Sequence, residues 1–133
     1  ALIMEKQYGQ ALANYQRAAR MVQDNPESYP PNLLSDTFRG MGNSLYRENN
    51  FSEGLLMYQQ SLAGAQQEKD LWWINSRIGQ GYTRLNRLEL GDKSFAEAKS
   101  AAGPQNEFAL KVIDAWKEDS LWIEQNKKYV GLP

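Results

Sequence analysis

Apolar residues between Phe38 and Leu62 form two stripes with helical spacing. Each stripe repeats at about i, i+3 or i+4, and i+7, which is the spacing of one face of an α-helix. The polar run Glu48-Asn49-Asn50 separates them. The pattern therefore predicts two amphipathic helices joined by a tight turn. The stripe residues are Phe38, Met41, Gly42 and Leu45, then Phe51, Leu55, Tyr58 and Leu62.

A glycine lies in each of these two predicted helices, and the same pair recurs later in the chain. Gly42 and Gly54 are twelve residues apart, as are Gly79 and Gly91. A glycine in a helix costs about 1 kcal/mol of helix propensity relative to alanine. A close approach of two helix backbones, which a larger side chain would prevent, would offset this cost. We therefore predict that these glycines lie in the seams between paired helices.

The residues around the glycines also repeat. Ile78-Gly79-x-x-Tyr82 matches Met41-Gly42-x-x-Leu45, and Gly91-x-x-x-Phe95-x-x-Ala98 matches Gly54-x-x-x-Tyr58-x-x-Ser61. Upstream, Ala11-x-x-x-Tyr15-x-x-Ala18 has the same second-helix pattern. The small anchors Ala11, Gly54 and Gly91 are 43 and then 37 residues apart. The chain is therefore predicted to contain three copies of one helical unit.

This pattern resembles the tetratricopeptide repeat (TPR) family, whose consensus is W-x2-L-G-x2-Y…A-x3-F…P. Phe38 takes the place of the Trp, and Asn75 replaces it in the later copy. The Phe place is taken by Tyr15, Tyr58 and Phe95, and Pro26 and Pro104 follow slightly late. The spacings exceed the usual ~34 residues, which indicates lengthened helices or connections. The resemblance covers residues 1–104 well and the remainder loosely.

The resemblance implies an all-α fold, a right-handed α-solenoid of about three TPR repeats with a C-terminal capping unit. We expect a single domain over residues 1–133, with four parts. These are a partial first repeat at 1–26, a second at 31–66, a third at 70–104, and a degenerate fourth unit or cap at 105–133. Ala1 already lies inside a helical pattern, so we expect the chain to be a fragment of a longer protein.

Local signals predict where the helices begin and end. If Ala11 is the small anchor of a second helix, the turn before that helix falls at Lys6-Gln7 and the helix runs from about Tyr8 to Gln23. Capping residues, prolines and polar runs predict the later boundaries. They indicate a helix that takes in Leu33 and Leu34, a cap at Asn50 or Ser52, a cap at Asp70, a helix end near Asn86, and a helix from about Leu88 to Ala101. After Pro104, Asp119-Ser120 marks either a turn or the polar face of one long helix. One of Trp72 and Trp73 is expected in the core and the other exposed or in a groove, while Trp116 and Trp122 are expected in the core of the cap.

The composition argues against catalysis. The chain has no Cys and no His, which removes disulfides, thiolate chemistry, the commonest metal ligand and the commonest general base. Its net charge of −1 lacks the basic surplus typical of nucleic-acid binding. No apolar run approaches the ~20 residues needed to span a bilayer. We therefore predict no enzyme activity, no cofactor, no metal, no nucleic-acid partner and no membrane insertion. The compartment stays open: the composition is compatible with a bacterial envelope or periplasmic protein, and also with a cytoplasmic one.

The resemblance implies that the first helix of each repeat lines a concave groove. The groove positions lie at −6, −3, +1 and +4 from each helix glycine. They are Asp36, Arg39, Asn43 and Tyr46, then Trp73, Ser76, Gln80 and Thr83, with Arg77 and Arg84 at the flanks. Arginine offers a planar fork of donors that suits carboxylates. The predicted partner-binding residues are Arg39, Asn43, Tyr46, Trp73, Arg77, Gln80 and Arg84.

The expected function is that of a protein-interaction scaffold or adaptor. The groove would bind a partner peptide or helix of acidic character. Two alternatives remain open. One is self-association through the N-terminal end, where Leu2, Ile3 and Met4 form an apolar patch, and the other is an accessory or ligand-binding domain of a larger enzyme.

Overall fold

The computed structural model describes residues 2–65 and 68–131, and in this part of the chain every regular element is helical. The elements are α1 (Leu2–Asp24), the 3-10 turn η1 (Pro26–Ser28), α2 (Leu33–Arg47), α3 (Phe51–Gly64), α4 (Glu68–Arg84), α5 (Leu88–Ala102) and α6 (Glu107–Asn126). They form two compact units, Ala1–Ala65 and Gln66–Pro133. The prediction of an all-α protein is confirmed over the described residues.

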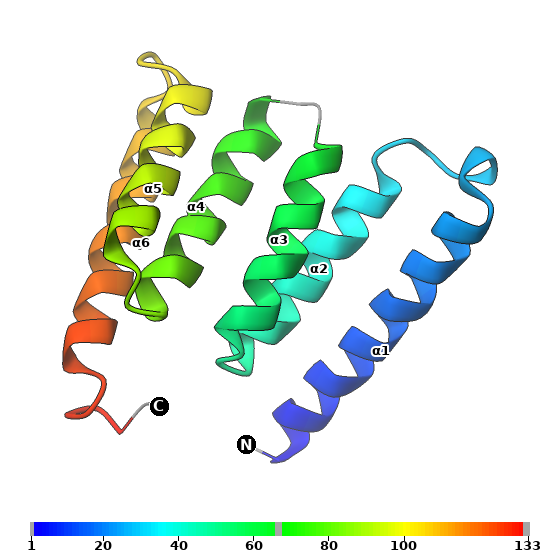
Figure 1. Ribbon diagram of the computed structural model, residues 1–133, viewed down its shortest axis with the longest axis horizontal. Helices are drawn as coiled ribbons and strands as arrows, with labels where there is room; N and C mark the ends of the chain where they lie inside the picture. The colour runs from blue at the N-terminus through cyan, green and yellow to red at the C-terminus, as the bar shows by residue number, and fades with distance from the viewer. Residues whose placement is uncertain (1, 66–67, 132–133) are drawn as a thin grey trace. The chain divides into compact units, whose positions relative to one another are not determined.

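In the first unit, α2 packs against both α1 and α3 (Figure 1). The buried core includes Ala19 of α1 together with Phe38 and Met41 of α2. The ring of Tyr15 covers Gly40 of α2, where an added Cβ would lie 2.5 Å from it. Thus α1 contacts α2 both at Gly40 and through this core, against which Met57 of α3 also packs.

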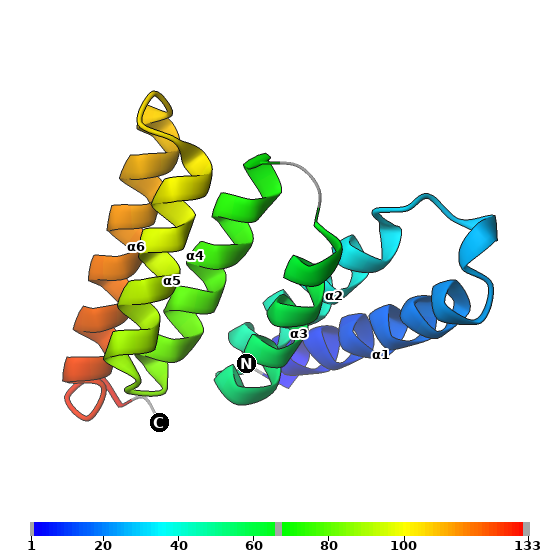
Figure 2. The same ribbon diagram turned by 45° about the horizontal axis from the view of Figure 1, so that its top comes forward.

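In the second unit, α4 packs against α5, and α6 packs against both of them (Figure 2). The core holds Trp72 of α4, Phe95 of α5 and Ile113 of α6, with Ala98 and Ala109 between them. The prediction that one of the two adjacent tryptophans lies in the core is confirmed for Trp72. Trp73 is partly buried beside the same cluster.

The four glycines lie in the helix seams as predicted. A Cβ on Gly42 would come within 2.7 Å of the ring of Tyr58, and one on Gly79 within 2.9 Å of the ring of Phe95. On the facing helices, a Cβ on Gly54 would lie 3.3 Å from the carbonyl oxygen of Gly42. At Gly91 the corresponding distance, to the carbonyl of Gly79, is 3.2 Å. Backbone therefore approaches backbone at both crossings.

The two hairpins also turn in the same way. Asn49 and Asn86, 37 residues apart, have φ values of 60° and 59°. The residue after each asparagine donates its N–H to a carbonyl near the end of the preceding helix: Asn50 to Leu45 at 2.9 Å, and Arg87 to Tyr82 at 2.8 Å. Each asparagine N–H also donates to a carbonyl at 3.0 Å, Asn49 to Tyr46 and Asn86 to Thr83. Together these two bonds form the Schellman ending of a helix. Asparagine tolerates the left-handed conformation better than most residues.

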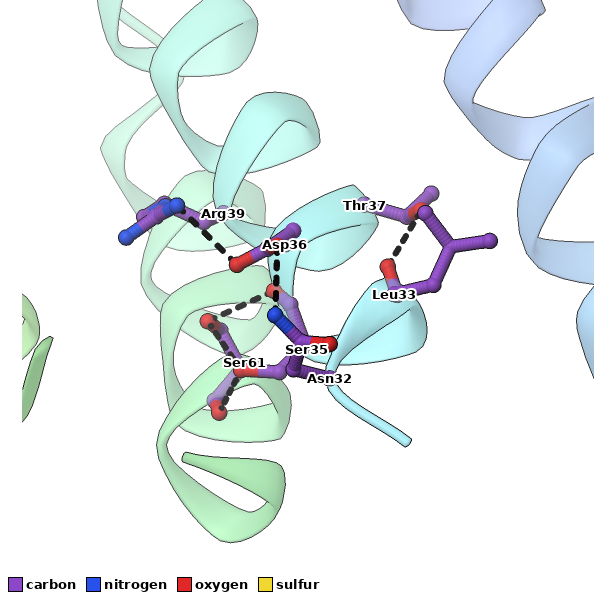
Figure 3. Close-up of polar contacts among 7 residues, drawn as sticks. All are labelled: Asn32, Leu33, Ser35, Asp36, Thr37, Arg39 and Ser61. Carbon is purple, nitrogen blue, oxygen red and sulfur yellow. Dashed lines mark hydrogen bonds and ion pairs between the residues drawn. The ribbon is translucent and has the colours of Figure 1, made fainter. Parts of the chain in front are cut away.

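The open end of the α2–α3 hairpin is joined by two buried serines (Figure 3). Ser35 Oγ donates to the carbonyl oxygen of Ser61 at 2.7 Å, and Ser61 Oγ donates to that of Ser35 at 2.8 Å. Each hydroxyl has a single hydrogen, so both hydrogens are used on backbone carbonyls. The pair leaves no buried hydroxyl donor unsatisfied at this helix contact.

Several predicted boundaries require correction. The helix α1 runs without a break from Leu2 to Asp24, so the turn expected at Lys6-Gln7 is wrong. Asn50 rather than Ser52 is the cap of α3, since its side chain accepts from the N–H of Glu53 at 3.4 Å. Asp70 lies within α4, which begins at Glu68, so it is not a cap. The side chains of residues 2–6 lie outside the described set, including those of the predicted N-terminal apolar patch.

The helix α6 runs without a break from Glu107 to Asn126, so Asp119-Ser120 is not a turn. Asn106 caps α6 by accepting from the N–H of Ala109 at 3.1 Å. Trp116 is partly buried against the core of its unit, as expected. Trp122 is 56% exposed, and its predicted place in the core is wrong because it lies on the face of α6 opposite α4 and α5.

Candidate interaction sites on the two helical units

In the first unit, Arg39 has an acidic neighbour on its own helix. Its Nη2 lies 3.0 Å from Oδ1 of Asp36, one turn earlier, and both side chains are partly exposed (Figure 3). Asn32 also reaches this carboxylate, at 3.4 Å. The charge of Arg39 is therefore balanced locally, and such an exposed pair contributes only about 0–1 kcal/mol to stability.

The other two predicted residues of the first unit contribute to the hairpin itself. Asn43 accepts a hydrogen bond at Oδ1 from the hydroxyl of Tyr58. The ring of Tyr46 lies over Gly54, with its centre 5.2 Å from that of Phe51 and 4.8 Å from that of Tyr58. Both side chains thus help to hold α3 against α2, and a role in partner binding would be additional.

In the second unit, Arg77 lies in the corner formed by two tryptophans. Its guanidinium carbon is 4.7 Å from the ring centre of Trp73 on α4 and 4.2 Å from that of Trp116 on α6. The two indoles meet edge to face, with centres 5.9 Å apart. Gln80 completes the group by accepting from Arg77 Nη1 at 3.0 Å. We call these four residues, Trp73, Arg77, Gln80 and Trp116, the arginine cage.

Two of the predicted groove positions on α4 are buried. Ser76 has no exposed surface and donates to the carbonyl oxygen of Trp72 at 2.7 Å. Thr83 is 4% exposed, and its Oγ1 occupies the space beside Gly91. Their predicted exposure is wrong because residues at −3 and +4 from Gly79 lie on the flank of α4 that packs within the unit. Tyr46, at +4 from Gly42, is likewise half-buried.

Arg84 forms an ion pair inside the second unit. Its Nε lies 3.8 Å from Oε1 of Glu124 on α6, and their side chains are 9% and 6% exposed. Burial lowers the pKa of Arg84 below its usual value, and the Glu124 carboxylate opposes part of this shift. Lys127 reaches the other carboxylate oxygen at 2.8 Å. The pair fixes the C-terminal ends of α4 and α6 together.

The structure thus brings together three of the predicted residues, Trp73, Arg77 and Gln80. Arg84 is directed to Glu124 instead, and the first-unit residues each have their own neighbours. Whether all seven share one binding wall stays a prediction, since the two units are described separately. The sequence analysis missed Trp116 and Glu124 as partners, because nothing in local spacing shows which face of α6 turns toward α4.

Three further features of the described residues concern other types of site. In this part of the chain there is no group of three or more Asp and Glu side chains placed to hold a metal ion. No described helix is long and apolar enough to cross a bilayer. A shallow hollow at the start of α5 is lined by Arg87, Leu88, Glu89 and Leu90, and none of the predicted binding residues contributes to it.

Comparison with known protein families, with curated proteins and with solved structures found no match for this chain.

Proposed function

We propose that the protein is a TPR-like helical-repeat scaffold that binds an acidic segment of a partner protein. Arg77, held in the arginine cage, would be the main contact on the second unit, and Arg39 and Asn43 would be contacts on the first unit. The observation that carries the proposal is the contact of the Arg77 guanidinium with the rings of both Trp73 and Trp116.

The two hairpins have the same contacts at their helix crossings and turns, which supports a helical-repeat fold. Both hairpins have a glycine crossing at the same offset and an aromatic ring, Tyr58 or Phe95, against the first glycine. Both also end their first helix with an asparagine in the left-handed region. A repeat that recurs after 37 residues with the same contacts is typical of solenoid proteins, which commonly act as binding surfaces.

The chemistry of the cage supports the choice of an acidic partner. Both rings contact the guanidinium from a corner where they meet at nearly right angles. A guanidinium makes its hydrogen bonds along its edge, in the plane of the N–H groups. That edge matches the two oxygens of a carboxylate. Stacking also restricts the arginine before a ligand arrives, which reduces the entropy lost on binding. Tryptophan and arginine are among the residues most enriched at energetically dominant interface positions.

The test is a selection of random peptides displayed on phage, with the immobilised protein as bait. We expect enrichment of peptides that contain Asp or Glu beside an apolar residue. The best peptide is then labelled and titrated by fluorescence anisotropy at two salt concentrations. Arg77→Ala should weaken its binding at least about tenfold, since the loss of a charged partner in an interface typically costs about 2–5 kcal/mol.

Arg20→Ala is the matched control, because Arg20 is an exposed arginine on α1 outside the proposed surface. It should bind the selected peptide as the parent protein does. Arg39→Ala is expected to have a smaller effect that shrinks at high salt, as exposed charges mainly alter association rates. The proposal fails if the selected peptides lack acidic residues, or if Arg77→Ala binds them unchanged while its circular dichroism spectrum stays native.

A further inference from the structure

The face of α6 that turns away from α4 and α5 carries large exposed aromatic side chains. Phe108 is 72% exposed and Trp122 is 56% exposed, and Ala115, midway between them, is exposed as well. These positions are seven residues apart, so they lie along one side of the helix over about 21 Å. The buried residues Ala109 and Ile113 pack into the core of the unit. The second unit therefore leaves an apolar helix face uncovered.

Two charged residues complete this stripe. Lys111 and Asp119 are exposed and lie between the apolar positions, and neither joins an ion pair with any residue that the structure describes. Neighbouring charges of α6 are engaged: Asp114 with Lys99 at 2.6 Å and Lys117 with Asp92 at 3.4 Å. We call the five residues that share this face the α6 stripe: Phe108, Lys111, Ala115, Asp119 and Trp122.

The order of residues in the α6 stripe is complementary to itself. Successive members are separated by 3, 4, 4 and 3 residues, so the spacing is the same when it is read in either direction. An antiparallel second copy would place Phe108 against Trp122 and Lys111 against Asp119. Ala115 would face its own counterpart on the two-fold axis, where a small side chain allows two helices to approach closely.

We propose that the α6 stripe is the surface through which two copies of this chain associate, with their α6 helices antiparallel about Ala115. A two-fold axis makes each contact occur twice, so two aromatic pairs and two ion pairs form at once. A parallel arrangement would instead bring Lys111 to Lys111 and Asp119 to Asp119. This proposal is independent of the arginine cage, because no residue of the α6 stripe belongs to the cage.

The first test is sedimentation equilibrium of the protein from micromolar to submillimolar concentrations. We expect a monomer–dimer equilibrium in which Trp122→Ala raises the dissociation constant about a hundredfold, because each dimer loses two aromatic anchors. Trp122 is exposed in the monomer, so the variant should keep the native circular dichroism spectrum. A protein that stays monomeric throughout, or a dimer that Trp122→Ala does not weaken, overturns the proposal.

The second test uses charge reversal and fixes the orientation of the helices. Lys111→Glu and Asp119→Lys should each weaken self-association by roughly tenfold, since each turns two attractive pairs into repulsive ones. The two variants mixed together should associate with each other. In that mixed dimer the new carboxylate of one chain faces the new ammonium group of the other, and the remaining native lysine faces the remaining native aspartate. The double variant should also associate as the parent does.

Lys93→Glu is the matched control, because it makes the same charge change at an exposed position of α5. It should leave the dissociation constant unchanged. If single reversals leave association intact, or if the mixture and the double variant fail to restore it, the antiparallel pairing is wrong.

Discussion

The hairpins α2–α3 and α4–α5 share a backbone plan but are closed differently at their open ends. Ser35 and Ser61 join α2 to α3 through two buried hydrogen bonds. The positions 37 residues later are Trp72 and Ala98, and both are buried in the apolar core of the second unit. One hairpin thus satisfies polar groups where the other fills volume.

The two hairpins share the contacts at their helix crossings and turns, and they differ at their open ends. Both hairpins keep the glycine crossings, the ring of Tyr58 or Phe95, and the asparagine turn. Those features set the distance between helix backbones. The open end has no such restriction, because either two short polar side chains or one large and one small apolar side chain complete the contact.

The largest effect is expected at Trp72, which joins α4 to α5 and α6 in the core of the second unit. Trp72→Ala should lower the free energy of unfolding by about 3–5 kcal/mol, as truncation of a buried aromatic residue leaves a cavity. Urea denaturation followed by circular dichroism measures this loss. If the free energy of unfolding falls no more than it does in Ser35→Ala, the two open ends contribute equally to stability and the contrast between them is wrong.

Gly42→Leu should destabilise the α2–α3 hairpin, and Gly79→Leu should destabilise the α4–α5 hairpin by a similar amount. Each added side chain would meet a ring, of Tyr58 or Phe95, that is at most 1% exposed and has no room to move. We expect losses of roughly 1–3 kcal/mol or more from overpacking, measured by the same denaturation. Gly9→Leu is the control, since a Cβ there meets nothing within 4 Å. A higher melting temperature in either seam variant would contradict the crossing geometry.

Arg47 and Arg84 occupy the same place in the two hairpins but differ in burial. Arg47 is exposed, whereas Arg84 lies beside Glu124 with its side chain 9% exposed. Arg84→Met should cost roughly 1–3 kcal/mol, less than breaking a fully isolated buried pair, because Lys127 still reaches Glu124.

Arg47→Met is the matched variant of this comparison and should change stability by at most about 0.5 kcal/mol. Calorimetric unfolding of the two variants checks the difference. Equal effects would show that α6 adds nothing to the anchoring of α4 at this point.

Among the substitutions that remove a buried contact, the smallest effects are expected at the two serines. Ser35→Ala and Ser61→Ala should each cost about 1 kcal/mol, the usual net value of one hydrogen bond. Because each hydroxyl donates to the other residue's backbone carbonyl, alanine at one site keeps the acceptor for the other. The two losses should therefore add within about 0.5 kcal/mol in a double-mutant cycle. A larger coupling would show that the hydroxyl oxygens, 3.2 Å apart, bind each other instead.

Helix spacing and glycine placement were enough to predict both hairpins. The stripes around Gly42 and Gly79 located the helices, and the twelve-residue offset to Gly54 and Gly91 located the crossings. These features depend on local periodicity and on the size of one side chain, so they are visible in the sequence.

The burial of the other side chains could not be predicted in the same way. Trp122 was expected in the core, but its exposure depends on whether another helix covers the far side of α6. The contact of Arg84 with Glu124 joins residues 40 positions apart, and no local pattern signals it. Ser76 and Thr83 were wrongly predicted to line an exposed groove. A short polar side chain that packs inside its own unit occupies the same place in the sequence pattern as one that faces water.

The two asparagine turns also bear on how the chain reaches this structure. Each turn reverses the backbone within a few residues, so the contacts nearest the turn join residues close in sequence, as Gly42 and Gly54 at a separation of twelve. The entropy of closing a loop grows with its length, and proteins rich in short-range contacts fold fastest. Each hairpin is therefore expected to form early, and a substitution that slows one should leave the folding rate of the other unchanged.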